Sequence, residues 1–225
     1  MSAERMEREP RNKDLVLAPG EYAYVQDVTK GQVRILVGPT IFSPTAQDQP
    51  VLYQMKGHKS FQPVKIDDCI QKSAIAVEGY YLVLLNPAGD NTQPDEESRK
   101  DVIPKLQVGR KINIPGPAMF PLWPGQSVTM VKGHHLRSNQ YLLVRIYNEE
   151  EAKANWSKAV VKPATDTEEE TIITGEAPSD LSVGKQYIIK GTDVSFYIPP
   201  TGVSVVADHN TMRGEQVGDG YVRDA

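Results

Sequence analysis

The sequence has little of what several classes of protein require. It contains one cysteine, Cys69, so no disulfide can form within the chain, and a reducing compartment is expected. No stretch approaches the roughly 18 apolar residues of a membrane-spanning helix, and the N-terminus does not resemble a signal peptide. We therefore expect a soluble cytoplasmic protein that makes no contact with a membrane.

The chain also lacks an excess of positive charge. It has 25 basic and 29 acidic residues, for a net charge of −4. Nucleic-acid binding depends on a basic stripe that displaces counterions from phosphates, and the sequence contains no such stripe. Direct binding to nucleic acid is therefore not expected.

Helical periodicity is almost absent, and short strands take its place. Only 39% of the residues are hydrophobic and 7% aromatic, while 17 glycines and 17 prolines interrupt short apolar runs. Apolar and polar residues alternate in residues 33–35, 112–114, 127–131 and 203–205, as in a sheet with one buried face. The pattern predicts an all-β protein with one short surface helix within residues 148–159.

A tyrosine-led apolar strand occurs three times along the chain. The copies start at Tyr22, Tyr80 and Tyr141, and each is followed by a second β-rich run. A repeat this short cannot bury a core alone, so the pattern predicts a linear array of small antiparallel β-sheets. The alternative is one ordinary β domain with frequent glycine turns.

Each copy ends its second run at a glycine that a phenylalanine follows closely. The glycines are Gly38, Gly116 and Gly191, and Phe196 lies one residue later than the first two copies predict. We expect tight turns in which at least two of these glycines adopt backbone angles that are costly for other residues. Further structural turns are expected at Pro124, Gly125 and Gly202.

These signals divide the chain into five segments. We predict an arm at residues 1–14, repeats at 15–73, 74–135 and 136–207, and a tail or the start of a further segment at 208–225.

Two polar excursions interrupt the repeats. Residues 86–105 and 162–180 are rich in turn-forming residues, so both are expected to loop out, with residues 171–174 as a candidate edge strand.

The N-terminal arm is flexible and charged in this interpretation, and its charges alternate in sign. Such a pattern can pair with an antiparallel copy of itself across a two-fold axis, and the alternative is a solvated tail. The candidate self-assembly residues are Glu4, Arg5, Glu7, Arg8, Glu9, Arg11, Lys13 and Asp14.

Residues that could perform chemistry are few. His134 and His135 are adjacent, so on a strand they point to opposite faces and cannot share a metal without a bulge. Asp67, Asp68 and Cys69 have no histidine or second cysteine at a metal-ligand spacing. We therefore expect no catalytic residue, no metal site and no cofactor, with an enzyme acting through Cys69 or the histidines as the weakest alternative.

The repeats resemble those of a known family. Residues 17–25, 32–40, 79–87, 121–126 and 136–145 are similar to strands and turns of the major vault protein family, and the resemblance covers roughly residues 15–206. It implies a row of antiparallel β modules whose copies stand side by side to form a hollow shell, with the N-terminal repeats where two halves meet. The chain departs from the family in having fewer repeats and neither a shoulder domain nor a long cap helix.

The leading hypothesis is a non-enzymatic structural protein that self-assembles laterally into a large shell or barrel-like particle. Its expected partners are copies of itself and other proteins of the particle. One alternative is a structural component of a viral particle or sheath, which would place the chain within that particle. Another is a soluble protein-binding module.

Overall fold

The computed structural model describes residues 14–54, 60–95, 103–164, 177–207 and 220–225. Strands predominate in these residues, which confirms the all-β class. The expected surface helix is present as α1 (Glu149–Asn155), and two 3-10 turns, η1 (Ile66–Cys69) and η2 (Trp156–Lys158), complete the helical part. The Asn148 side chain caps α1 by accepting a hydrogen bond from the Glu151 backbone N–H.

The chain forms two compact units. The first consists of Met1–Ala74, Ala88–Gln107 and Met119–Gln126, and the second of Ile75–Pro87, Val108–Ala118 and Ser127–Ala225. The division into three repeats at residues 15–73, 74–135 and 136–207 stays a prediction.

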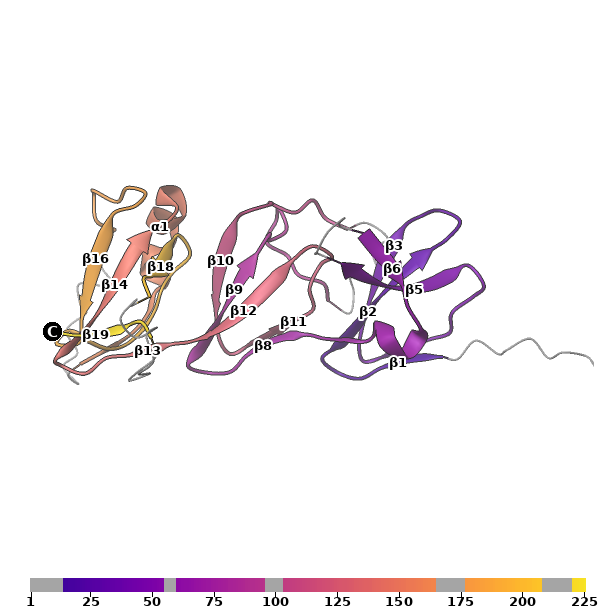
Figure 1. Cartoon of the computed structure of the whole chain (residues 1–225), viewed down its shortest axis with the longest axis horizontal. Coiled ribbons are helices and arrows are strands. Elements are labelled where there is room, and N and C mark those ends of the chain that lie inside the picture. The colour runs from indigo at the N-terminus through magenta and orange to yellow at the C-terminus, as the bar shows by residue number, and fades with distance from the viewer. Residues whose placement is uncertain (1–13, 55–59, 96–102, 165–176, 208–219) are drawn as a thin grey trace, which may run out of the picture. The chain divides into compact units, whose positions relative to one another are not determined.

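The first unit is organised around strand β2 (Glu21–Asp27). Its neighbours in the sheet are β3 (Val33–Val37), β5 (Asp48–Gln54) and β7 (Gln71–Lys72), and β6 (Ser60–Pro63) lies beyond β5 (Figure 1). A two-stranded sheet pairs β1 (Leu15–Leu17) with β4 (Thr40–Phe42).

Both faces of β2 are buried, because successive side chains point to opposite sides of a strand. Tyr22 and Tyr24 pack with Trp123 in one hydrophobic core. Ala23 and Val25 pack with other apolar side chains in a second core, which includes Leu15, Leu17 and Cys69.

Residues 86–105 do not simply loop out, so this expectation is wrong for their described part. Ala88 is fully buried in the core of the first unit and forms an isolated β-bridge with Leu106. The Trp123 indole N–H donates to the Thr92 carbonyl at 3.1 Å. Apolar residues scattered through this polar stretch therefore anchor it. Residues 96–102 lie outside the described part of the chain.

The second unit has two central strands, β9 (Tyr80–Leu85) and β14 (Gln140–Ile146). Strand β9 lies between β10 (Lys111–Pro115) and β12 (Ser127–Lys132), as Figure 1 shows. Strand β14 pairs with β16 (Gln186–Lys190) on one side and with β18 (Val203–Val205) and β19 (Val222–Asp224) on the other.

A further sheet of the second unit has the order β13 (His134–His135), β17 (Val194–Ile198), β15 (Val160–Pro163). The remaining pair is β8 (Ala74–Ala76) with β11 (Ala118–Phe120), and the division of the chain passes through both strands. The tyrosine-led strands β2, β9 and β14 thus each occupy the middle of a sheet. The expected C-terminal tail contributes strand β19, whereas residues 208–219 lie outside the described part.

Gly38 is required for a reason other than the one that we expected. Its φ lies outside the left-handed region, as do those of Gly116 and Gly191, so no left-handed angle supports the expected backbone angles that are costly for other residues. A Cβ on Gly38 would lie 2.9 Å from the carbonyl carbon of Ala18, and closer still to its oxygen. The close approach of two backbones therefore excludes a side chain.

The same close approach recurs at the other two glycine corners. A Cβ on Gly116 would lie 2.9 Å from the carbonyl carbon of Val77, and one on Gly191 would lie 2.7 Å from that of Arg137. The backbone N–H groups of Gly38, Gly116 and Gly191 donate to Glu21, Tyr80 and Gln140 at 2.8, 2.8 and 2.7 Å. The three corners thus share one local structure. By contrast, Gly125 and Gly202 have φ values of 98° and 96°, as tight turns at these positions require.

Strand pairing explains the late position of Phe196. Phe42 lies opposite Leu15 in the β1 and β4 pair, whereas Phe196 lies opposite His135. Tyr197 lies opposite the buried His134 and so holds the position that corresponds to Phe42.

Candidate functional site

The candidate at Cys69 is a structural residue. Its side chain is fully buried at the end of η1, and the thiol donates to the Ile66 carbonyl at 3.0 Å. Burial raises the pKa of the Cys69 thiol, which disfavours the reactive thiolate. Asp67 and Asp68 are exposed beside it. The described residues contain no group of three or more side chains suited to hold a metal ion.

The two histidines point to opposite faces of β13, as the sequence predicts. His134 is fully buried, and its Nε2 lies 3.4 Å from the Tyr81 hydroxyl. Its ring also packs edge-on against Tyr221 at 5.1 Å between centroids. His135 is exposed and packs against the ring of Phe196 at 4.8 Å.

Of the eight candidate residues of the charged arm, Glu4, Arg5, Glu7, Arg8, Glu9, Arg11 and Lys13 lie outside the described residues. Asp14 is described and is exposed. The self-complementary arm stays a prediction.

Large apolar side chains are exposed on strands that lie at sheet edges. Six strands of the described part carry such a residue, and each of these strands pairs with a single neighbour within that part. We refer to the six side chains as the edge apolar residues: Val16, Ile41, Ile75, Met119, Met130 and Ile188. The sequence analysis did not identify them. A usable signal is an apolar triplet on a strand, such as residues 15–17, because its middle side chain points to the face opposite its two neighbours.

Val16 and Ile41 form the most exposed pair of this set. They lie opposite each other in the β1 and β4 pair and are 58% and 70% exposed. The neighbours of Val16 in the chain, Leu15 and Leu17, point to the opposite face and are buried. This small sheet therefore has an apolar surface on both faces.

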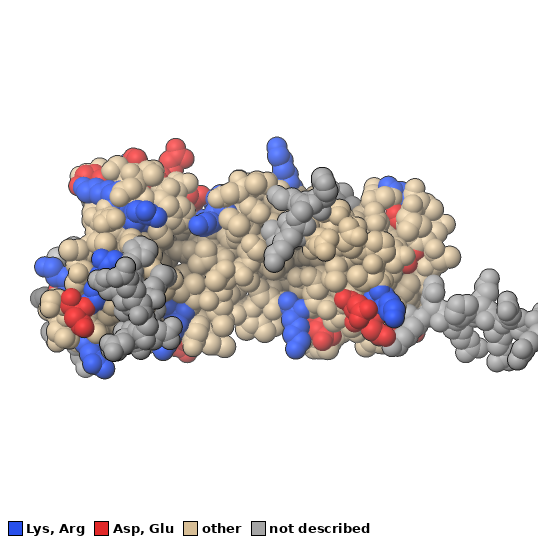
Figure 2. Space-filling view, in the orientation of Figure 1, with Lys and Arg blue, Asp and Glu red and all other residues tan. Residues whose placement is uncertain are grey.

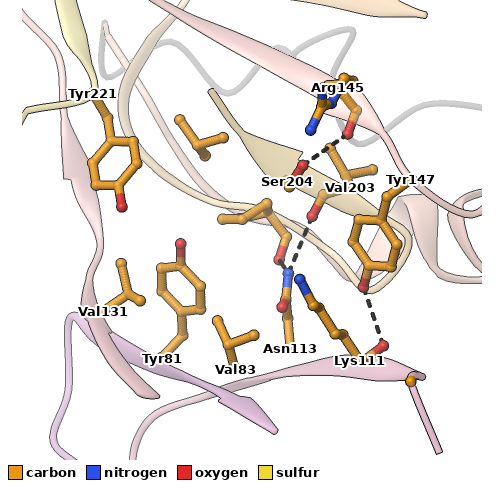
Figure 3. A pocket seen from close by; sticks show the side chains of 13 residues that line it. Tyr81, Val83, Lys111, Asn113, Val131, Arg145, Tyr147, Val203, Ser204 and Tyr221 are labelled. Carbon is orange, nitrogen blue, oxygen red and sulfur yellow. Dashed lines mark hydrogen bonds between the residues drawn. The ribbon is translucent and has the colours of Figure 1, made fainter. Parts of the chain in front are cut away.

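The second unit contains a pocket of about 410 Å³ (Figure 3). Its apolar side is formed by residues of β9, β12 and β18, which include Val83, Val131 and Val203, together with the rings of Tyr81 and Tyr221. Its other polar side chains come from β10, β14 and β18, and from Tyr147, which follows β14. These strands are far apart in the sequence, so no local motif indicates the pocket.

Asn113 of β10 holds one side of the pocket in place. Its amide Nδ2 donates to the carbonyls of Pro199, Pro200 and Val203 at 3.1, 3.1 and 3.3 Å. Its backbone N–H donates to the Thr201 hydroxyl at 2.9 Å. One side chain thus ties β10 to the turn that precedes β18, because a primary amide can bond to several carbonyls.

Tyr147 forms a second link in the same place. Its hydroxyl donates to the Lys111 carbonyl at 3.1 Å and accepts a hydrogen bond from the Gly202 N–H at 3.0 Å. Burial raises the pKa of Tyr147, so the hydroxyl keeps its proton and can make both bonds. Hydrogen bonds of Asn113 and Tyr147 therefore fix this side of the pocket.

The comparisons with known proteins give no assignment, since no model of a protein family matches the chain and no curated protein is similar to it. Among the described residues, no helix is long and apolar enough to cross a membrane. On the face drawn in Figure 2, acidic and basic side chains are interspersed and broad areas carry neither.

Proposed function

We propose that this protein is a non-enzymatic structural protein that self-assembles laterally through its edge strands into a large shell- or sheath-like particle. The observation that carries the proposal is that six large apolar side chains, the edge apolar residues, are exposed on strands that pair with only one neighbour in the described part. An edge strand offers unpaired backbone N–H and C=O groups to a strand of another molecule. An exposed apolar side chain on that strand adds favourable free energy of association when the other molecule buries it.

The size of that gain supports association through several contacts rather than one. Burial of a valine, isoleucine or methionine side chain contributes about 1.5–3 kcal/mol, and partly exposed ones less. A stable pair of proteins buries roughly 1,600 Å² in total, which is more than a single small strand pair provides. Edge apolar residues occur in both units, so adjacent copies can use several of them together.

The recurrence of one local structure supports an array. The corners at Gly38, Gly116 and Gly191 share the same hydrogen bond and the same close backbone approach. Repeated modules present similar edges at successive positions, as a protein that stands side by side with its copies requires. The resemblance to the major vault protein family agrees with this interpretation. In this interpretation, contacts between the alternating charges of residues 4–14 join two half-particles.

Light scattering after size exclusion tests the proposal with a matched pair of variants. The double variant Val16→Thr and Ile41→Thr keeps β-branched residues in the strands but removes apolar surface. We expect the unmodified chain to form large species and the double variant to shift towards smaller ones. The control is Val28→Thr, because Val28 is 57% exposed in the same unit but lies in a turn.

The control variant should assemble like the unmodified chain. A double variant that assembles equally well would exclude the β1 and β4 pair as a contact. A monomeric unmodified chain would exclude self-assembly itself.

A further inference from the structure

The pocket of the second unit is positively charged. Its thirteen lining residues include Lys111 and Arg145 but no aspartate or glutamate. Both basic side chains belong to exposed residues, and neither has an ion-pair or hydrogen-bond partner among the residues that the structure describes. Two cations thus border one cavity, and no described lining residue compensates their charge.

A nearby carboxylate is already engaged elsewhere. Glu151 of α1 forms an ion pair with Arg110 at 2.5 Å and accepts a hydrogen bond from the Asn155 side chain at 3.1 Å. Arg110 precedes Lys111 in the chain but does not line the pocket. The ion pair therefore leaves the charges of Lys111 and Arg145 available to a ligand.

The remaining polar lining groups are occupied within the protein. The Asn113 amide nitrogen and the Tyr147 hydroxyl hold the walls together, and the Ser204 hydroxyl donates to the Arg145 carbonyl at 3.3 Å. The apolar side presents valines and two phenol rings, and Figure 3 shows the hydroxyls of Tyr81 and Tyr221 directed toward each other. A ligand therefore meets cations on one side and flat apolar surface on the other.

We infer that this pocket binds a small organic anion, with its acidic group toward Lys111 and Arg145 and its apolar body against Tyr81, Val131 and Tyr221. A volume of about 410 Å³ is in the range of small-molecule sites, which combine apolar walls with a few charged groups. Arginine binds carboxylate and similar oxyanions through its planar fork, while lysine adds a point charge. None of the six edge apolar residues is among the lining residues of this pocket, although β12 contributes Val131 to the pocket and carries Met130 as well.

A matched pair of fluorescent probes tests the inference on the full chain. 8-Anilinonaphthalene-1-sulfonate is an organic anion, and N-phenyl-1-naphthylamine has the same aromatic body without the charge. We expect the anion to bind at one site per chain and more tightly than the neutral probe. Added salt should weaken the binding of the anion alone, because exposed charges are screened.

The variants Lys111→Gln and Arg145→Gln locate the site. Together they should weaken binding of the anionic probe about tenfold and leave binding of the neutral probe unchanged. The matched control is Lys190→Gln, an exposed lysine on β16 of the same unit that does not line the pocket. Near-ultraviolet circular dichroism checks that each variant keeps the native fold.

Equal affinity for the two probes, or unchanged affinity for the anion in the double variant, would overturn the inference. Equal weakening by Lys190→Gln would overturn it as well, since it would indicate a general charge effect. Loss of anion binding in the double variant while the chain still assembles would support the pocket site and leave the assembly proposal untouched.

Discussion

Replacement of Gly38 by alanine should destabilise the first unit far more than an ordinary glycine substitution. The new Cβ would lie 2.9 Å from the Ala18 carbonyl carbon and 3.0 Å from the Leu17 oxygen, and closer still to the Ala18 oxygen. These are backbone atoms, so no side-chain rotation can relieve the clash. The corner must move by on the order of 1 Å to restore ordinary contacts.

Two contributions set the expected magnitude. Overpacking of this kind costs about 1–3 kcal/mol. The movement also weakens the hydrogen bond from the Gly38 N–H to the Glu21 carbonyl, which measures 2.8 Å, and such a bond contributes about 1 kcal/mol. We therefore expect the free energy of unfolding to fall by about 2–4 kcal/mol.

Urea unfolding followed by tryptophan fluorescence measures the effect on this unit. The chain has two tryptophans, Trp123 in the first unit and Trp156 in the second, so a Trp156→Phe background reports on the first unit alone. Gly89→Ala is the control in the same unit, because its Cβ would meet only the Lys105 oxygen at 3.6 Å. The control should change stability by less than about 1 kcal/mol. Equal effects of the two substitutions would refute the close-approach argument.

Three further results are expected. The variant Asn113→Ala removes an amide that donates hydrogen bonds to three carbonyls, so the free energy of unfolding of the second unit should fall by about 1–3 kcal/mol. Urea unfolding followed by Trp156 fluorescence measures this change. An unchanged unfolding midpoint would contradict the role of this amide. Burial raises the pKa of Tyr24, whose hydroxyl donates to the Leu122 carbonyl at 2.5 Å. Because the tyrosine of the unfolded chain ionises near its ordinary pKa of about 10, the first unit should lose stability as the pH rises above that value. The variant Tyr24→Phe should reduce the slope of the free energy of unfolding against pH. If the arm joins half-particles, an increase of ionic strength by about tenfold should split full assemblies into halves. Deletion of residues 1–14 should have the same effect. An assembly that responds to neither change would show that the arm is an ordinary tail.

The sequence was sufficient to predict the fold class, because alternation and turn residues are local signals. It also located the tyrosine-led strand β2, whereas the place of β2 in the middle of a sheet and its burial on both faces are known only from the structure. The corner at Gly38 was located correctly but explained wrongly. Its requirement for glycine comes from the backbone of Ala18, twenty residues away, which no turn rule describes.

The candidate sites were harder to predict, because they depend on pairing between distant strands. The pocket combines Tyr81, Lys111, Arg145 and Tyr221, and nothing in the sequence near any one of them indicates the others. The burial of Ala88 was missed because it lies in a polar stretch, where a single alanine carries little signal. Edge apolar residues can be recognised only when the partners of each strand are known.

Sedimentation velocity of the unmodified chain over a wide range of concentration tests the central claim most directly. The account predicts species many times heavier than the 24.9 kDa monomer, with a share that grows as concentration rises. A single species at the monomer mass throughout the range would contradict it.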